Sequence, residues 1–162
     1  KSTKRQKNRR NQFNENAMIH QTTTGKLAEW ALTLYYLDKG EQISDPDMTI
    51  YNARGKSFDA DLTLNNKDLH VKSQTVVSAK RFGTSWMFQF DGKGYGHKDP
   101  LLQYANGDVA FCIVDFTNKQ VHIEGICNFQ KIRHKLKEPV KQMLKNTKRC
   151  IYLRDLTQED FN

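Results

Sequence analysis

The chain has 162 residues, with 26 basic residues, 18 acidic residues and a formal net charge of +8. This length predicts a single domain with a core of ordinary size. The sequence shows neither an apolar run that could span a membrane nor a signal-peptide pattern, so we expect a cytoplasmic protein, or one in the host cell interior if it is viral, with no membrane partner.

The first ten residues, KSTKRQKNRR, carry six basic groups and no acid. Because they lack apolar periodicity, we interpret residues 1–16 as a basic, disordered arm and residues 17–162 as one domain. Such charge runs are often simply solvated, and others serve as localisation or RNA-binding tails. We expect this arm to contact the phosphates of a nucleic acid. The side chains that would do so are Lys4, Arg5, Lys7, Arg9 and Arg10.

Residues 25–39, GKLAEWALTLYYLDK, predict an amphipathic helix that ends at Gly40. Its expected apolar face consists of Leu27, Trp30, Ala31, Leu34 and Leu37. Glu29 lies nearly opposite Leu27 on a helical wheel, and an exposed side chain is the ordinary outcome at such a position.

Residues 58–74, FDADLTLNNKDLHVKSQ, predict two strands joined by a tight turn, because apolar and polar residues alternate on both sides of NNKD. If the hairpin closes with Leu64 opposite Leu69, Asp61 lies directly across from Lys72. Opposed residues have β-carbons about 5 Å apart. The polar side chains that would gather on one small patch of this hairpin are Asp61, His70, Lys72 and Gln74.

A carboxylate beside an ammonium group and a further metal ligand suits metal-assisted hydrolysis of a phosphodiester. The carboxylate can hold a hard divalent cation, which lowers the pKa of bound water. The lysine can stabilise the charge that develops on phosphorus. The alternative is a cross-strand salt bridge on a solvated face, which stabilises a hairpin by only about 0.2–1 kcal/mol.

An Asp on one strand, a short hairpin and then an acid-x-Lys triplet resembles the PD-(D/E)XK nuclease superfamily. Asp61 and His70-Val71-Lys72 carry the resemblance, with His70 where the family usually has an acid. The resemblance implies an α/β fold with a restriction-endonuclease-like mixed β-sheet core flanked by helices. A literal Pro46-Asp47 pair also precedes the triplet, but its setting, ISDPDMT, is typical of a turn.

The same resemblance implies roles for the site residues. Asp61 would bind Mg²⁺ or Mn²⁺. His70 would be either a second metal ligand, which favours Mn²⁺, or a base that orients the water. Lys72 would act on the transition state, and Gln74 would position water or phosphate. Glu29, from the first helix, is the candidate for an acid at the edge of the metal site.

Residues 91–98, DGKGYGHK, predict a glycine-rich loop that is either a flexible surface loop or a DNA contact through Lys93, Tyr95 and Lys98. Strand composition marks residues 84–90, 108–116 and 120–127, with a hairpin turn about Asn118. A final helix is expected near residues 139–146. Residues 131–149 carry eight basic groups and one acid.

Together these features predict a metal-dependent endodeoxyribonuclease that acts on double-stranded DNA. A homodimer would provide two active sites for cutting both strands. Two alternatives remain open. One is a catalytically inactive nucleic-acid-binding protein of the same fold. The other is a structure-specific nuclease acting on RNA or on DNA junctions.

Overall fold

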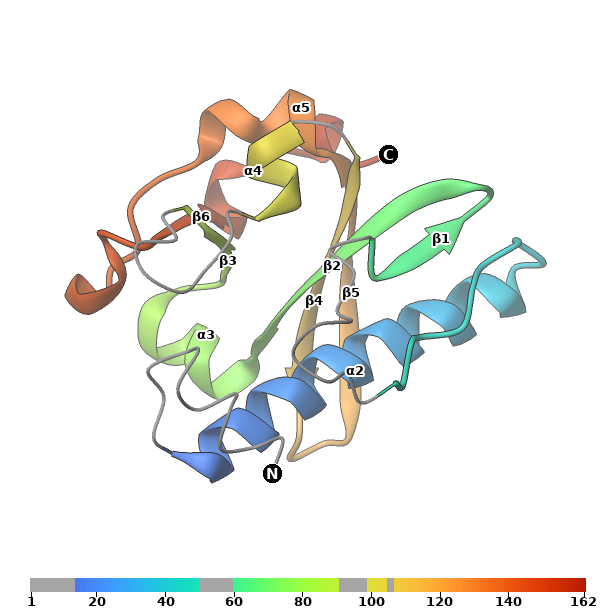
Figure 1. Cartoon of the computed structure of the whole chain (residues 1–162), viewed down its shortest axis with the longest axis horizontal. Coiled ribbons are helices and arrows are strands. Elements are labelled where there is room, and N and C mark those ends of the chain that lie inside the picture. The colour runs from blue at the N-terminus through green and yellow to red at the C-terminus, as the bar shows by residue number, and fades with distance from the viewer. Residues whose placement is uncertain (1–13, 50–59, 91–98, 105–106) are drawn as a thin grey trace.

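The computed structural model describes residues 14–49, 60–90, 99–104 and 107–162 (Figure 1). The predicted nucleic-acid contacts of the arm and of the loop at 91–98 lie outside the described residues. No helix in the described ranges is long and apolar enough to cross a membrane.

The structure is a mixed α/β fold built on a four-stranded sheet with the order β1-β2-β4-β5. Its strands are β1 (Leu62–Leu64), β2 (Lys67–Thr75), β4 (Asp108–Asp115) and β5 (Gln120–Asn128). β2 and β4 run parallel, whereas β1–β2 and β4–β5 are antiparallel hairpins. A second sheet pairs β3 (Ser85–Gln89) with β6 (Lys148–Tyr152). The mixed sheet and flanking helices confirm the expected fold class at this level.

Helices flank the larger sheet and connect its strands. The long helix α2 (Glu15–Asp38) precedes β1, and α3 (Val76–Phe82) follows β2 directly. The chain then passes through β3 and α4 (Pro100–Tyr104) before it enters β4. After β5 come α5 (Phe129–Ile132) and the 3-10 turns η1 (Arg133–Lys135), η2 (Gln142–Leu144), η3 (Leu153–Asp155) and η4 (Gln158–Asp160).

α2 begins ten residues before the helix that the sequence predicts. The Asn14 side chain accepts a hydrogen bond from the Ala17 N–H at 3.1 Å and so caps the first turn. Residues 15 and 16, which we assigned to the arm, are therefore helical. The end of the helix is as expected, because Gly40 has a φ of 76° and donates its N–H to the Leu37 carbonyl.

The predicted apolar face of α2 is wrong. Leu34 is 61% exposed, and Leu27, Trp30 and Leu37 are exposed as well. The helix turns a different face toward the sheet, with Ala28 and Leu32 packed against the strands. Two polar residues, Glu29 and Thr33, share this buried face, and Thr33 satisfies its hydroxyl by donating to the Ser44 carbonyl. Because Glu29 and Thr33 are polar, the sequence pattern indicated the wrong buried face of the helix.

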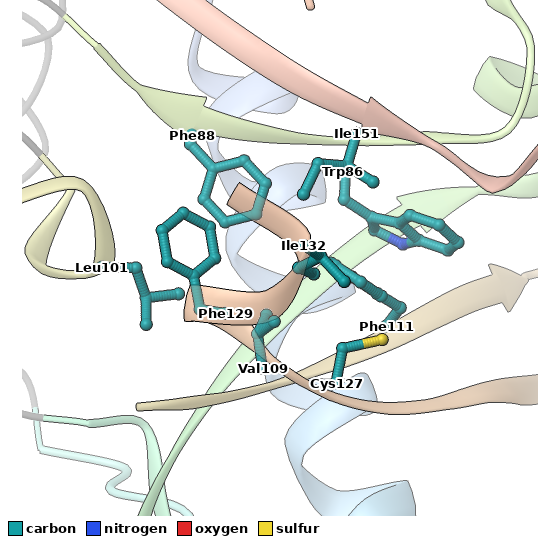
Figure 2. Packing of buried hydrophobic residues seen from close by; sticks show 9 residues of the cluster. All are labelled: Trp86, Phe88, Leu101, Val109, Phe111, Cys127, Phe129, Ile132 and Ile151. Atoms are coloured by element: carbon teal, nitrogen blue, oxygen red, sulfur yellow. The ribbon is translucent and has the colours of Figure 1, made fainter. Parts of the chain in front are cut away.

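The larger sheet is packed on both faces, which explains why β4 is almost entirely apolar. On one face α2 lies across β2, β4 and β5 (Figure 1). On the other face lies the cluster in Figure 2, contributed by both sheets and by α4 and α5. Its centre is Trp86, whose ring stacks on Phe111 at 4.4 Å and whose indole N–H donates to the Cys112 carbonyl.

The strands expected at 84–90, 108–116 and 120–127 are confirmed with small changes at their ends. The turn about Asn118 is confirmed too, because the Asp115 carboxylate accepts the N–H groups of Thr117 and Asn118. The helix expected near 139–146 is wrong: this segment holds only the short turn η2. Strand β6, which follows it, was not expected from the basic composition of the region.

Candidate active site

The β1–β2 hairpin closes two residues sooner than the sequence predicts. Asn65 and Asn66 both have positive φ, 49° and 62°, and form a two-residue turn of the kind that suits the twist of paired strands. Leu64 therefore pairs with Lys67, and Leu62 pairs with Leu69. The predicted pairing of Leu64 with Leu69 is wrong by two positions, so each side chain keeps its face and changes only its cross-strand partner.

In this register Asp61, one residue before β1, falls opposite His70 instead of Lys72. The Asp61 Oδ2 atom accepts the backbone N–H of Val71 at 2.8 Å, which fixes the exposed carboxylate against β2. The predicted Asp61–Lys72 pairing is thus wrong. The two residues expected to bind a metal ion, Asp61 and His70, instead occupy opposed positions.

His70, Lys72 and Gln74 lie on one face of β2, as the alternation of the sequence predicts. In the parallel register they stand beside Val109, Phe111 and Ile113 of β4. This is the face covered by the cluster of Figure 2, so the three polar side chains border an apolar core. Leu69 and Val71 point to the opposite face and pack under α2.

His70 is held in a confined position with only 9% of its surface exposed. A β-carbon at Gly107 would come within 3.5 Å of its ring, and Gly107 has a φ of 123° that favours glycine. Burial lowers the pKa of His70, and the nearby Lys72 charge lowers it further, whereas Asp61, Asp99 and Asp68 oppose the shift. The imidazole is therefore neutral at pH 7, as a metal ligand or a proton acceptor must be.

Lys72 forms an ion pair that the sequence did not reveal. Its Nζ atom lies 2.5 Å from the Asp99 Oδ2 atom and 5.2 Å from the centre of the Phe88 ring. Both members are shielded, with 19% of the Lys72 side chain and 7% of the Asp99 side chain exposed. A charge pair of this kind is stronger and less screened by salt than a surface pair.

Asp99 is fixed from two directions at the start of α4. Its Oδ1 atom accepts the Leu101 N–H at 3.3 Å, and its carbonyl accepts the N–H groups of Leu102 and Gln103. Its own N–H donates to the Gln89 carbonyl at the end of β3. An Asp-Pro pair before a helix is a recognisable start signal, but nothing in the sequence places it beside Lys72.

The Gln74 side-chain amide forms hydrogen bonds within the fold through both its oxygen and its nitrogen. Its Oε1 atom accepts the Ser85 N–H at 2.8 Å, and its Nε2 atom donates to the Gly83 carbonyl and to the Ser78 hydroxyl. Only 8% of the residue is exposed. Gln74 therefore ties the end of α3 to the start of β3 and lies apart from the pair of Lys72 and Asp99.

Glu29 is buried, contrary to the ordinary outcome for a residue at its wheel position. It is 6% exposed, and its carboxylate pairs with Lys26 at 2.5 Å. However, α2 covers the sheet face opposite to the one that carries His70 and Lys72, so Glu29 does not join these two residues.

Asp47 forms a turn in which its carboxylate accepts the Thr49 N–H, as we expected for the Pro46-Asp47 pair.

A metal ion at this site would need additional ligands from solvent or substrate. Within the described residues, no three His, Cys, Asp or Glu side chains converge to hold a metal ion. Mg²⁺, however, usually binds proteins through one or two carboxylates and takes its other ligands from water and phosphate. Asp61 with a neutral His70 fits this requirement.

A hollow of about 250 Å³ lies at the turn of the hairpin. Its walls include Tyr36, Leu64, Leu69 and Ile126, which belong to or border the core under α2. It therefore opens on the other face of the sheet from Lys72 and is not the site of the polar cluster.

Comparison of the chain with family models, curated proteins and solved structures found no match.

Proposed function

We propose that the protein is a metal-dependent endonuclease that hydrolyses phosphodiester bonds in DNA. The observation that carries the proposal is the convergence of Asp61, His70, Lys72 and Asp99 around one face of β2. A carboxylate, a neutral imidazole and an ammonium group held by a second carboxylate are groups that metal-assisted phosphodiester hydrolysis can use.

The arrangement of elements supports a restriction-endonuclease-like core. A long helix comes first, and Ile43 then forms a single antiparallel bridge with Leu64 at the edge of the sheet. The hairpin of β1 and β2 follows, and β4 joins β2 in parallel. These elements agree with the mixed sheet flanked by helices that the resemblance implies.

In the proposed reaction each residue has a task that follows from its surroundings. The neutral His70 has one free lone pair, so it either binds the metal ion or accepts a proton from the attacking water, and the burial that lowers its pKa favours both roles. Lys72 donates to a phosphate oxygen and stabilises the charge that grows there in the transition state. Asp99 keeps the Lys72 ammonium group in place and balances its charge until the phosphate arrives.

Asp61 and His70 would hold the metal ion, Mg²⁺ or Mn²⁺. Once bound, such an ion lowers the pKa of a coordinated water and screens the phosphate charge. The substrate phosphate and solvent would complete its coordination, because the described residues provide no third ligand.

The test is cleavage of supercoiled plasmid by the purified protein with Mg²⁺, Mn²⁺ or EDTA. We expect nicking or cutting with either metal and none with EDTA. Asp61→Asn and Lys72→Met should each reduce the rate by about 100-fold or more. Lys67→Met, from the same hairpin, and Asp38→Asn, on the exposed end of α2, are controls and should retain activity. Wild-type rates for both site variants would overturn the assignment.

A second candidate function is nucleic-acid binding without catalysis. It is favoured by the pairing of Lys72 with Asp99 and by the lack of a three-ligand group among the described side chains. A protein that binds duplex DNA but cuts neither DNA, RNA nor a four-way junction with any divalent metal would have this function. Cleavage of RNA or junctions alone would instead identify a structure-specific nuclease. Sedimentation with and without DNA would test the proposed homodimer.

A further inference from the structure

The segment between η1 and β6 leaves the body of the molecule and returns to the same point. Lys137 and Cys150 form an antiparallel bridge, with hydrogen bonds of 2.8 and 2.9 Å between their backbones. Residues 138–149 between them form a projecting loop, which Figure 1 shows at the left edge of the molecule beside β6. We call this segment the 138–149 loop.

The 138–149 loop is held in a defined conformation. At its start, the Tyr152 hydroxyl donates to the Glu138 carbonyl and accepts the Val140 N–H. At its end, the Arg149 guanidinium donates to the Lys145 carbonyl at 2.6 Å and lies 4.1 Å from the centre of the Phe90 ring. The η2 turn at the tip is closed by further backbone bonds. A loop fixed in this way loses little entropy when it binds a partner.

The surface of this loop combines positive charge with exposed apolar groups. From Glu138 to Arg149 there are four basic residues and one acid; Lys148 and Arg149 contact Gln89 and Phe90, which leaves Lys141 and Lys145 as the basic side chains for a partner. Met143 is 73% exposed and Val140 is 61% exposed. The exposed Lys141 lies between them in the sequence. The one acid, Glu138, meets Lys145 at 3.8 Å in a solvent-exposed pair, and such pairs are weak, so a phosphate can replace the carboxylate.

The loop is connected to the candidate active site through three consecutive residues. Phe88 lies beneath the Lys72 ammonium group, and the Gln89 carbonyl accepts the N–H of Asp99. Phe90 then donates its N–H to the Thr147 carbonyl of the loop and lies against Arg149. The second sheet that carries these contacts covers the same face of β2 as His70 and Lys72. The loop is therefore joined to the candidate active site through β3.

We propose that the 138–149 loop binds double-stranded DNA, with Lys141 and Lys145 on the phosphate backbone and Met143 and Val140 in the groove. Basic side chains beside apolar ones suit the minor groove, where apolar side chains wedge between base steps while lysine and arginine neutralise phosphates. The inference rests on the proposed function for the identity of the ligand. It adds a binding surface outside the site of hydrolysis.

The experiment measures the affinity of the full-length protein for a 25-base-pair duplex by fluorescence anisotropy in EDTA, across a range of salt concentrations. Lys141→Gln and Lys145→Gln should each weaken binding about fivefold to tenfold at 0.1 M salt and flatten the log–log salt slope by about 0.9. Met143→Ser should weaken binding about threefold to tenfold without changing the slope, because an apolar contact releases no counterions. Lys67→Gln and Val77→Ser are the matched controls, since both residues are exposed and lie outside the loop.

Wild-type affinity and salt slope in both lysine variants would overturn the proposal, provided that thermal unfolding shows each variant to be folded. Equal affinity for the single strand would overturn the assignment to a duplex. Because EDTA prevents metal-dependent cleavage, the result is separate from the hydrolase proposal. Loop-dependent binding without cleavage by any metal would keep the loop assignment and overturn the hydrolase. Cleavage by the wild type, together with normal binding by the loop variants, would support the hydrolase and overturn the loop assignment.

Discussion

The Nζ atom of Lys72 lies 2.5 Å from the Asp99 carboxylate, and this contact joins β2 to the first turn of α4. The lysine was expected to pair with an acid on the neighbouring strand. It instead pairs with Asp99, which lies in the connection between the parallel strands β2 and β4. The contact fixes the position of the only side chain to which we assign stabilisation of the transition state.

The first prediction concerns Asp99 as a positioning residue. Asp99→Asn should lower kcat for plasmid cleavage by about tenfold to 100-fold, because Lys72 loses the charge that orients it. Duplex affinity in EDTA should not fall, since the substitution removes a negative charge beside the phosphate site. Asp99→Glu should recover part of the rate. Asp38→Asn, on the exposed end of α2, is the control. Weaker binding with an unchanged kcat would contradict a positioning role.

The second prediction concerns the acid limb of the pH–rate profile. Because burial lowers the pKa of His70, its neutral form persists below the ordinary value of about 6.5. Cleavage that needs this neutral imidazole should therefore remain close to its plateau at pH 6.5 and decline only at lower pH. His70→Ala should lose activity or change the profile. Wild-type rates and an unaltered profile in that variant would remove His70 from the reaction.

The same shift predicts how stability depends on pH. A lowered pKa means that the unfolded chain binds the His70 proton more tightly than the folded chain does. The contribution of His70 to stability is therefore complete above about pH 6.5 and declines as the pH falls toward its folded pKa. Urea denaturation at pH 7.5 and pH 5 should show a smaller loss for His70→Gln than for the wild type. An equal loss in both proteins would contradict the shift.

The fourth prediction concerns metal preference. Imidazole is a softer ligand than carboxylate, so the wild type should cut faster with Mn²⁺ than with Mg²⁺. His70→Glu places an acid opposite Asp61, and it should move the preference toward Mg²⁺ while preserving some cleavage. The ratio of initial rates with the two metals measures this change. A ratio that does not move would show that residue 70 is outside the metal shell.

The fifth prediction tests which face of α2 is buried. Leu32→Ala should destabilise the protein by about 2–5 kcal/mol, because Leu32 is fully buried under the sheet. Leu34→Ala removes the same atoms from a side chain that is 61% exposed, and its effect should stay within about 0.5 kcal/mol. Chemical denaturation of the two variants provides the measurement. Similar losses in both would indicate that a partner covers the exposed face.

Much of the fold follows from local signals in the sequence. The alternation of Leu69 and Val71 with His70 and Lys72 predicts the two faces of β2, and β4 is recognisable as a buried strand. Turn residues also locate the hairpin. These local signals do not decide the length of the turn, because NNKD can close as a turn of two or four residues. The choice of Asn65-Asn66 alone changed the partner of Asp61.

The errors arise where tertiary packing overrides a local pattern. α2 has leucines at helical spacing on a face that remains exposed, whereas Glu29 and Thr33 are buried. Asp99 could not be assigned to the site, because only the path of the chain through β3 and α4 brings it to Lys72. The loop before β6 has helix-forming residues but is shaped by bonds to Tyr152 and Phe90, which lie outside it.

The parallel pairing of β2 with β4 has a kinetic consequence. Its paired residues, such as Leu69 and Asp108, lie roughly forty residues apart in the chain, whereas β1–β2 and β4–β5 are local hairpins. Contacts between distant segments require costly loop closure before they stabilise anything. We therefore expect the two hairpins to form before they dock on each other. Asp61 and His70 meet within one hairpin, whereas Asp99 must come to Lys72 from the connection between β2 and β4, so we expect the polar cluster to be completed late.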